Sequence, residues 1–417
     1  MEELPGKIRA YLAGIKDEKL SWEEANSLSR ELENLVNTLG LEIVAQEIVN
    51  VRENHIRYGM GTGKAEELAQ KAASCEADCL IFDRNISPSQ QRNWETLSGI
   101  SVIDRQELII QIFASRARTR EAELQVRMAE LQYSLPRLQH KYIDLSRQRG
   151  GRYGTRGSGE TRLETDRRLV EQQIHRLKEE LEDVKRQRRL QHRLRERQGI
   201  PVCALVGYTN SGKSTILNAL TGAGVLAEDK LFATLDSTSR RLELPLGTQV
   251  LLVDTVGFIR RLPHSLIDAF RSTLEELSQA DLLINVLDAS DQDADSQYQT
   301  TLSVLRDLEA GDIPMITVLN KIDRLESAEA LLSFSGEAVP VSAIEGKGLT
   351  ELCERMERTL SRGTIRFRFP PERTDLAALL HRSGCVISKK YEENCIEIEA
   401  RVDDRTAGRL KEYQINE

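Results

Sequence analysis

The stretch that decides the fold reads PVCALVGYTNSGKST and covers residues 201–215. Its first part is an apolar run typical of a buried strand, and residues 207–214 have the spacing G-x-x-x-x-G-K-S. Ile216, Leu217 and Leu220 follow at helical spacing. A glycine loop between a strand and a helix directs backbone N–H groups and a helix N-terminus at one point, which suits a polyphosphate. The sequence therefore predicts a phosphate-binding loop in an α/β domain.

Three further motifs follow in order, each at the end of an apolar run. Residues 250–257 read VLLVDTVG, residues 314–323 read PMITVLNKID, and residues 339–343 read VPVSA. The Asp323 carboxylate can accept N1–H and the exocyclic amine of guanine, whereas adenine offers neither donor there. N-K-x-D is weak evidence alone. When N-K-x-D (residues 320–323) follows the phosphate loop and D-x-x-G (residues 254–257) in this order, the three motifs predict a guanine-nucleotide site. We expect the site at the C-terminal ends of the strands of a mostly parallel sheet with helices on both faces.

Two residues indicate unusual hydrolysis. The residue after D-x-x-G, often a water-orienting glutamine in small GTPases, is Phe258, whose ring cannot orient water by hydrogen bonding. Asn210 stands in the phosphate loop where glycine is common, as in GTPases that recruit K⁺ near the phosphates; stabilisation of the loop explains it equally well. We expect slow intrinsic hydrolysis that a macromolecular partner raises. Thr234 or Thr238 is expected to close over the γ-phosphate and Mg²⁺.

Composition points to a multidomain chain with a polyanionic partner. The 417 residues suggest about three domains by length alone. The net charge is −8, but residues 117–200 carry +8 and the rest −16. A basic middle in an acidic chain favours a polyanion. The six scattered cysteines are typical of reduced thiols, and C-x-x-x-C at Cys75 and Cys79 is a poor zinc motif. We expect a cytoplasmic protein without a membrane span or secretory leader.

The chain is expected to have a small α/β domain over residues 1–116, a helical hairpin over 117–199, the nucleotide domain over 200–362 and a small α+β module over 363–417. Residues 1–35 look helical and polar. YGMGTGK at 58–64 resembles a second phosphate loop, but it lacks the Ser/Thr and the full spacing, so a tight glycine turn is the preferred interpretation. The module begins with a strand-like alternation, IRFRF, and continues with one helix and two strands.

The hairpin prediction rests on apolar residues that recur in steps of three and four, as in a coiled coil. They are Leu124, Met128, Leu131, Leu135, Leu138, Tyr142 and Leu145, and then Leu163, Val170, Ile174, Leu177, Leu181 and Val184. Between the two runs lies RGGRYGTRGSGE at 149–160, whose five glycines cost about 1 kcal/mol each in a helix. The arginines around this tip predict RNA binding, although a solvated face is the plain alternative; they are Arg149, Arg152, Arg156 and Arg162.

These motifs together resemble the HflX-type GTPases, the ribosome-associated branch near the Obg GTPases. Outside the nucleotide domain the resemblance rests on SPSQ (87–90), IDR (103–105), IFASRART (112–119), YSLPRL (133–138) and GTRGSGETRLETDRR (154–168). Inside it, GYTNSGKS, FATLD (232–236) and DTVGF fit, and the match selects Thr234 over Thr238.

The resemblance implies a GTPase that binds the large (50S) ribosomal subunit and its rRNA, and that splits or rescues stalled or hibernating ribosomes. It implies a monomer with no DNA partner. Some members are reported to use ATP, so residues 58–64 stay open as a second site. The alternatives are a GTPase for ribosome assembly or RNA modification and a nucleotide-gated adaptor whose hairpin binds protein.

The expected site residues form three overlapping groups. Mg²⁺ is expected on Ser214, on Thr234 and, through water, on Asp254. Roles in hydrolysis are expected for Lys213, Thr234, Gly257 and Asn210. Nucleotide contacts are expected from Gly207, Tyr208, Thr209, Asn210, Ser211, Gly212, Lys213, Ser214, Phe232, Ala233, Thr234, Leu235, Asp236, Asp254, Thr255, Val256, Gly257, Asn320, Lys321, Ile322, Asp323, Ser342, Ala343 and Ile344.

Overall fold

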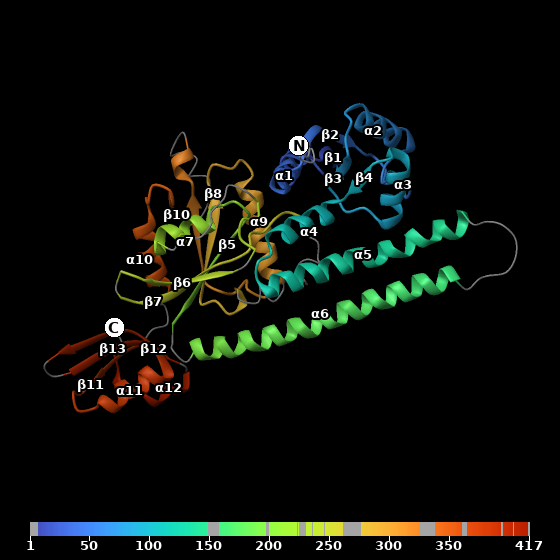
Figure 1. Cartoon of the computed structure of the whole chain (residues 1–417). Coiled ribbons are helices and arrows are strands. Elements are labelled where there is room, and N and C mark those ends of the chain that lie inside the picture. Colours follow the sequence, from blue (N-terminus) through green and yellow to red (C-terminus); the bar gives the residue numbers. More distant parts are fainter. Residues whose placement is uncertain are drawn as a thin grey trace, which may run out of the picture. The chain divides into compact units, whose positions relative to one another are not determined.

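The structure is a computed structural model of the whole chain, shown in Figure 1. It describes residues 7–148, 158–196, 200–222, 224, 231–235, 237–245, 247–261, 277–325, 338–360, 365–392, 395–402 and 404–415. The chain forms two compact units. The first unit contains Met1–Glu182, Lys230–Phe232 and Leu262–Phe270, and the second contains Asp183–Asp229, Ala233–Arg261 and Arg271–Glu417. No helix in the described part of the chain is long and apolar enough to cross a membrane.

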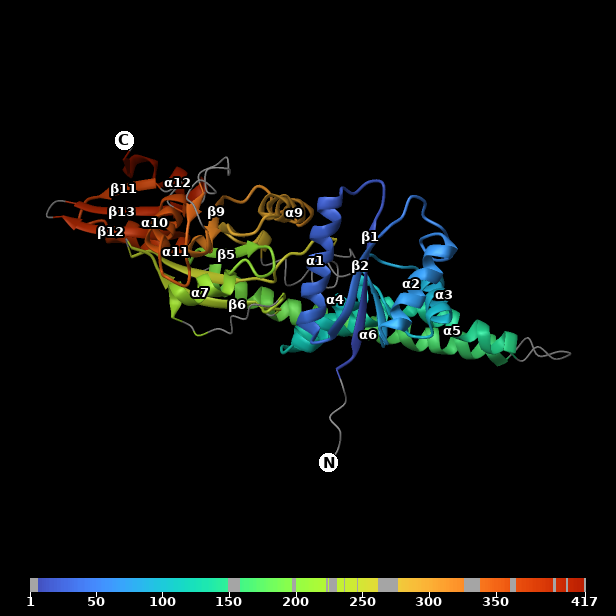
Figure 2. The same cartoon turned by 90° about the horizontal axis from the view of Figure 1, so that it is seen from above.

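The first unit begins with a three-layer α/β domain. A parallel sheet of order β2-β1-β3-β4 is formed by β1 (Arg9–Lys16), β2 (Glu42–Asn50), β3 (Cys79–Phe82) and β4 (Ser101–Ile103). Helices α1 (Trp22–Leu39) and α4 (Arg105–Arg116) cover one face, and α2 (Thr62–Ser74) and α3 (Pro88–Ser98) cover the other (Figure 2). The α/β prediction is confirmed.

The helix expected over residues 1–35 is wrong in its first part, where β1 lies. Tyr11, Leu12 and Ala13 are at most 3% exposed, because a strand inside a parallel sheet is covered on both faces. Such a strand has no polar side, so its sequence shows no alternation. Helix α1 starts only after Ser21, whose hydroxyl accepts from the Glu24 N–H at 3.1 Å in a capping box.

The glycine-rich stretch at 58–64 forms a turn into α2. Gly59 has φ +74°, a left-handed backbone that favours glycine. Lys64 donates through Nζ to the carbonyl of Asn50. A phosphate-loop lysine would face the loop's own centre, so the structure supports the glycine turn.

The hairpin consists of α5 (Arg120–Gln148) and α6 (Ser158–Glu196), which run antiparallel in Figure 1. Leu124, Met128 and Leu131 are buried in α5, while Val170, Ile174 and Leu177 are half-buried among exposed neighbours in α6. Burial follows the predicted seam in α6, whereas α5 also buries residues outside the seam, such as Val126 and Ala129. The helical hairpin is confirmed. The predicted tip residues Arg149, Arg152 and Arg156 lie outside the described residues, as does the side chain of Arg162.

The nucleotide domain lies in the second unit and has a six-stranded sheet of order β10-β9-β8-β5-β7-β6. Only β6 (Thr238–Glu243) runs antiparallel to its neighbour, so the predicted mostly parallel sheet is confirmed. Its other strands are β5 (Val202–Gly207), β7 (Gln249–Asp254), β8 (Leu282–Asp288), β9 (Met315–Asn320) and β10 (Val339–Pro340). One face packs on α7 (Lys213–Thr221) and α10 (Leu349–Leu360), and the other on α9 (Ala294–Asp307).

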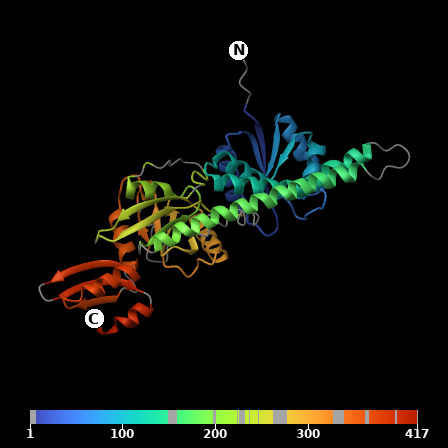
Figure 3. The ribbon, with the colours of Figure 1, turned by 60° about the horizontal axis from the view of Figure 1, so that its bottom comes forward.

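The C-terminal module is an antiparallel sheet of order β12-β13-β11-β14, drawn in red at the lower left of Figure 3. The predicted strand-helix-strand-strand order is present as β11 (Ile365–Phe369), α11 (Thr374–Ser383), β12 (Gly384–Glu392) and β13 (Cys395–Val402). Two short elements were not predicted, α12 (Asp404–Arg409) and β14 (Gln414–Ile415). Phe367 and Phe369 face the helices and are fully buried.

Candidate guanine-nucleotide site

The phosphate loop joins β5 to α7, and two of its glycines are required by close approach. Gly207 and Gly212 have φ +135° and +95°. A Cβ on Gly207 would collide with the carbonyl oxygen of Val286, and one on Gly212 with the side-chain amide of Asn320. The loop therefore lies directly against β8 and against the N-K-x-D segment.

Lys213 opens α7 and points back into the loop. Its Nζ donates to the carbonyl oxygens of Tyr208 at 2.7 Å and Gly207 at 3.2 Å. The side chain is 6% exposed, and this burial lowers the pKa of Lys213 to about 8, although the nearby Asp254 carboxylate acts in the opposite direction. The loop therefore holds a cation whose charge is poorly solvated and which an anionic ligand would stabilise.

A cluster of two hydroxyls and a carboxylate lies beside the loop. Ser214 Oγ donates to Asp254 Oδ2 at 2.5 Å and lies 2.8 Å from Thr234 Oγ1. Asp254 is fully buried, and its Oδ1 has no hydrogen-bond partner among the described residues. Burial raises the pKa of Asp254 in spite of the Lys213 charge. Thr238, the other threonine considered, begins β6. The structure thus brings Ser214, Thr234 and Asp254 together from three separate segments.

The D-x-x-G segment is joined to the phosphate loop by backbone hydrogen bonds. The Thr209 N–H donates to the Phe258 carbonyl at 2.8 Å, and the Phe258 N–H donates to the Gly207 carbonyl at 3.0 Å. Gly257 lies so close that a Cβ there would be 2.7 Å from Thr209 Cα. The Phe258 side chain is 2% exposed and packs in the core with Val206 and Leu283. Its ring therefore lies in the core of the domain.

The base-recognition segment is held by hydrogen bonds across the domain. Asn320 donates through Nδ2 to the Ser211 carbonyl at 2.9 Å and accepts from the Ala343 N–H at 3.2 Å. Asn320 therefore ties the phosphate loop to the V-S-A segment. The Ser342 hydroxyl donates to Asp323 Oδ1 at 2.6 Å, which orients an exposed carboxylate.

Lys321 connects this segment to the phosphate loop. Its Nζ donates to the Asn210 carbonyl at 2.8 Å and pairs with Asp288 Oδ2 at 2.7 Å. Asn210 has φ +61°, which asparagine tolerates better than most residues. The motifs of the sequence did not point to Asp288 as a site residue. Its place at the C-terminal end of an apolar strand was the available signal, because such ends meet at one edge of a parallel sheet.

The remaining predicted contacts differ in where they lie. Asp236 lies outside the described residues. Ile344 is 71% exposed beside the buried Ala343. Phe232 belongs to the first unit, although Ala233 and the residues after it belong to the second. Thr255 and Val256 are buried, Leu235 is buried, and Ile322 begins a 3₁₀ turn.

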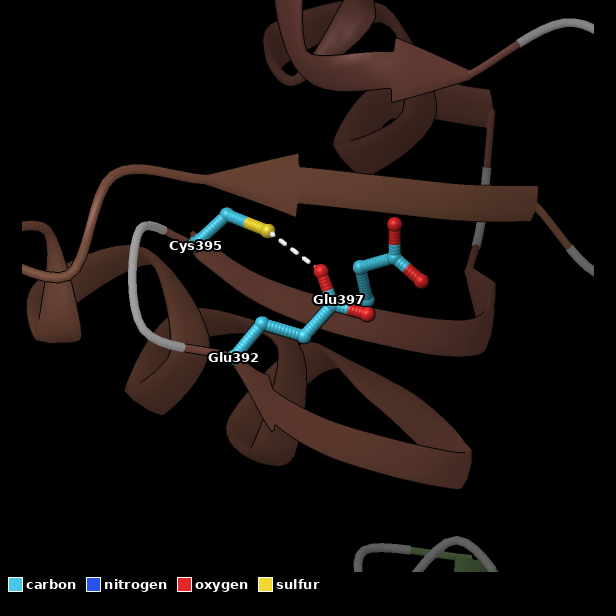
Figure 4. A group of neighbouring side chains, drawn as sticks. All are labelled: Glu392, Cys395 and Glu397. Carbon is cyan, nitrogen blue, oxygen red and sulfur yellow. Dashed lines mark hydrogen bonds between the residues drawn. The ribbon is translucent and has the colours of Figure 1, made fainter.

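One group outside this site has ligand atoms close together. Glu392, Cys395 and Glu397 lie at the β12–β13 hairpin with these atoms within 4.8 Å of one another (Figure 4). Glu397 accepts from the Arg368 guanidinium at 2.9 Å, and Cys395 donates to Glu392 at 3.4 Å. Partial burial, together with Glu392, raises the pKa of the Cys395 thiol. These contacts explain the cluster as hairpin pairing, and we assign no metal to it.

The fold and the site define a class. A mostly parallel sheet carries a phosphate loop, a cluster of Ser214, Thr234 and the buried Asp254, and a guanine-type N-K-x-D loop at one edge. This is the arrangement of P-loop GTPases.

Comparison with known families gives the same class over most of the chain. Residues 26–114 match a family described as the N-terminal region of GTP-binding GTPases, and residues 116–195 match its middle region. Residues 202–321 match the 50S ribosome-binding GTPase family.

Relatives extend this match to nearly the full length. GTPase HflX of Akkermansia muciniphila is 48% identical over 410 residues, which cover 94% of this chain and 93% of the relative. GTPase HflX of Escherichia coli K12 is 40% identical over 371 residues, covering 88% and 87%. A GTP-binding protein of Sulfolobus solfataricus solved with GDP covers 85% of this chain and 99% of its own, with 23% identity and a TM-score of 0.45. The chain belongs to the HflX family of GTPases, and it is a GTP hydrolase.

Proposed function

We propose that this GTPase binds the large ribosomal subunit and uses GTP binding and hydrolysis to split or rescue stalled or hibernating ribosomes. The observation that carries the proposal is the match of residues 202–321 to the 50S ribosome-binding GTPase family, within a chain that is similar to HflX proteins over nearly its whole length. We further propose that it acts in the cytoplasm as a monomer.

The charge of the hairpin supports an RNA partner. Residues 117–200 carry +8 in a chain of net charge −8. The described surface of α6 does not carry this excess, because it exposes carboxylates as well as cations, for example in the pairs Arg167–Glu171 and Arg186–Asp183. Arginine and lysine neutralise RNA phosphates and release their counterions. We therefore propose rRNA contacts at Arg149, Arg152, Arg156 and Arg162.

The hydroxyl–carboxylate cluster fits a bound Mg²⁺. Ser214 and Thr234 offer hydroxyl oxygens 2.8 Å apart, and the buried Asp254 has an unpaired Oδ1 among the described contacts. Hard oxygen donors of this kind suit Mg²⁺, with Asp254 reaching it through water. When bound, Mg²⁺ would neutralise phosphate charge. We propose that Ser214 and Thr234 hold it directly.

The other proposed roles follow from the contacts around the loop. Lys213 would donate to the β- and γ-phosphates in place of its present carbonyl partners, and the Gly257 N–H would contact the γ-phosphate. Asp323 and the Ala343 N–H would select guanine. Phe258 is buried in the core, which supports slow hydrolysis until a partner completes the site.

Asn210 is proposed to help recruit K⁺ beside the phosphates. Its backbone is held in a left-handed conformation, and Lys321 binds its carbonyl at 2.8 Å. The GTPase rate should then be higher in K⁺ than in Na⁺ at equal ionic strength, and Asn210→Ala should remove the difference. Equal rates in the two salts for the native chain would exclude this role.

Subunit binding and splitting are tested separately. The full chain is centrifuged with 50S subunits in GDP, GTP or a non-hydrolysable GTP analogue, and 70S particles are followed on sucrose gradients. We expect co-sedimentation with the analogue and loss of the 70S peak with GTP. Ser214→Ala is the matched control, since it should impair both. Pelleting that does not depend on nucleotide would contradict the proposal. Binding to 50S without splitting would instead favour a role in subunit assembly.

A further inference from the structure

The structure joins a motif that the nucleotide chemistry leaves without a task, residues 112–119, to the segment that carries Thr234, residues 232–236. The ring of Phe113 in α4 meets the ring of Phe232 edge to face, with centroids 4.6 Å apart and planes at 83°. Both side chains are 2% exposed. In this arrangement the positive edge of one ring faces the negative face of the other, which is favourable. Phe232 is therefore anchored on α4.

The backbone of Phe232 needs such an anchor. Its φ is +54°, a value that bulky residues rarely adopt and that persists only where the surroundings secure it. The buried ring pair secures it here. Since φ at Phe232 sets the direction of the next peptide, releasing the ring would redirect the chain into Ala233 and Thr234.

Helix α4 is itself firmly held in the first unit. Arg105, at its first turn, is 1% exposed and pairs with Asp83 at 2.6 Å and with Glu31. These partners come from the end of β3 and from α1. Asp104 caps the helix by accepting from the Glu107 N–H at 2.8 Å. Phe113 thus stands on a helix fixed to the sheet.

The same helix is connected to the first arm of the hairpin. Tyr133 in α5 donates through its hydroxyl to Glu107 at 3.0 Å. Arg137, one turn further, donates to Asp104 at 3.0 Å. Helix α4 is therefore bonded to the first arm of the hairpin as well as to the sheet of its own domain.

We propose that Phe113 is a positioning residue for GTP hydrolysis, because it holds Phe232 and, through two residues of backbone, the Thr234 hydroxyl that lies 2.8 Å from Ser214. This inference rests on the proposed role of Thr234 in holding Mg²⁺. Loss of the ring contact is therefore expected to weaken Mg²⁺ binding at Thr234.

The test measures GTPase activity of the full chain against Mg²⁺ concentration. Phe113→Ala and Phe232→Gly should each raise the Mg²⁺ concentration for half-maximal activity and lower kcat, by about three- to tenfold, because one aromatic pair is lost. Glycine at 232 keeps the left-handed backbone accessible, so a defect there assigns the effect to the ring. The double variant should be no worse than the worse single one. In Phe113→Ala, affinity for GDP without Mg²⁺ should not change.

The matched control is Leu108→Ala, which removes another fully buried side chain from α4. It should lower stability and leave the Mg²⁺ requirement unchanged. If Leu108→Ala and Phe113→Ala raised the Mg²⁺ concentration for half-maximal activity equally, general destabilisation would explain the effect. That result would overturn the inference. Wild-type Mg²⁺ dependence in Phe113→Ala, with activity lost in Thr234→Ala, would also overturn it while the Thr234 role stands. A wild-type Mg²⁺ requirement in Thr234→Ala would refute that role itself.

Discussion

For single residues of this GTPase, the motif predicts the chemical role. It does not predict the burial, the hydrogen-bond partners or the pKa of the side chain. The G-K-S spacing predicts a phosphate-facing lysine. Only the structure shows that Lys213 is buried, with its Nζ on loop carbonyls and its pKa lowered to about 8. Likewise, N-K-x-D predicts guanine selection by Asp323, but the 2.6 Å bond from Ser342 that orients the carboxylate is a tertiary contact.

The lowered pKa of Lys213 predicts proton uptake on nucleotide binding. The phosphates stabilise the ammonium, so the pKa rises in the complex and affinity should fall as pH rises through about 8. Calorimetry at pH about 9 in buffers of different ionisation enthalpy should show this uptake. Lys213→Arg, which stays charged, should not show it. Native binding without proton uptake at that pH would contradict the lowered value.

In the protein without nucleotide, the lowered pKa of Lys213 affects folding stability, which changes with pH in the opposite direction to nucleotide affinity. Between about 8 and 10.5 the unfolded chain binds more protons at this lysine than the folded one, so the contribution of Lys213 to stability rises with pH.

The Asp323 carboxylate predicts base preference. In Asp323→Asn the amide can donate to the 2-oxo group of xanthine, while guanine loses its acceptor. We expect kcat/KM for GTP relative to XTP to fall by roughly 10²-fold or more. Asp312→Asn, at an exposed acid of the same domain, should leave the ratio unchanged. A retained GTP preference in Asp323→Asn would remove the carboxylate from base selection.

At the scale of elements, the spacing of apolar residues predicts the helices and strands that bury one side of their surface. The three-and-four steps of α5 and α6 and the alternation of β11 predict elements that the structure contains, since apolar residues recur in each at the period of the element. Strand β1 escaped prediction because it is buried on both faces. Residues 58–64 resemble a phosphate loop locally, but the fold turns Lys64 toward Asn50.

The buried ion pairs of Arg105, at the start of α4, are expected to contribute to the stability of the first unit. In Arg105→Met the carboxylates of Glu31 and Asp83 stay buried without their cation, which should cost about 3–5 kcal/mol. Urea unfolding can be followed by fluorescence, because the two tryptophans, Trp22 and Trp94, both lie in this unit.

Arg127→Ala is the control for this measurement. It breaks an exposed pair with Glu130 and should cost under about 1 kcal/mol. An Arg105→Met midpoint within the range of this control would show that the buried pairs contribute little.

At the scale of the whole molecule, the charge asymmetry predicts salt-dependent binding to 50S. Replacing Arg149, Arg152 and Arg156 by alanine should weaken binding to 50S. It should also reduce the steepness of log affinity against log salt by about 2 to 3, because fewer phosphates are neutralised and fewer counterions are released on binding. Sedimentation at several salt concentrations measures the slope.

The control removes three exposed arginines from the second unit, at positions 241, 306 and 373. We expect a native slope for it. The same slope in the native chain and the tip variant would mean that these arginines do not contact phosphate. The four-part division of the chain also stays a prediction, since the two compact units do not test it.

The sequence by itself determined the order of the nucleotide motifs, guanine as the base, the mostly parallel sheet and the helical hairpin. These follow from spacing, because a strand, a glycine loop and a helix are set by neighbours in the chain. Tertiary structure alone decided that Lys321 pairs with Asp288, that Phe258 is buried in the core and that Phe113 holds Phe232. Each of these joins residues from separate segments, and only packing of the folded chain brings such residues within contact distance.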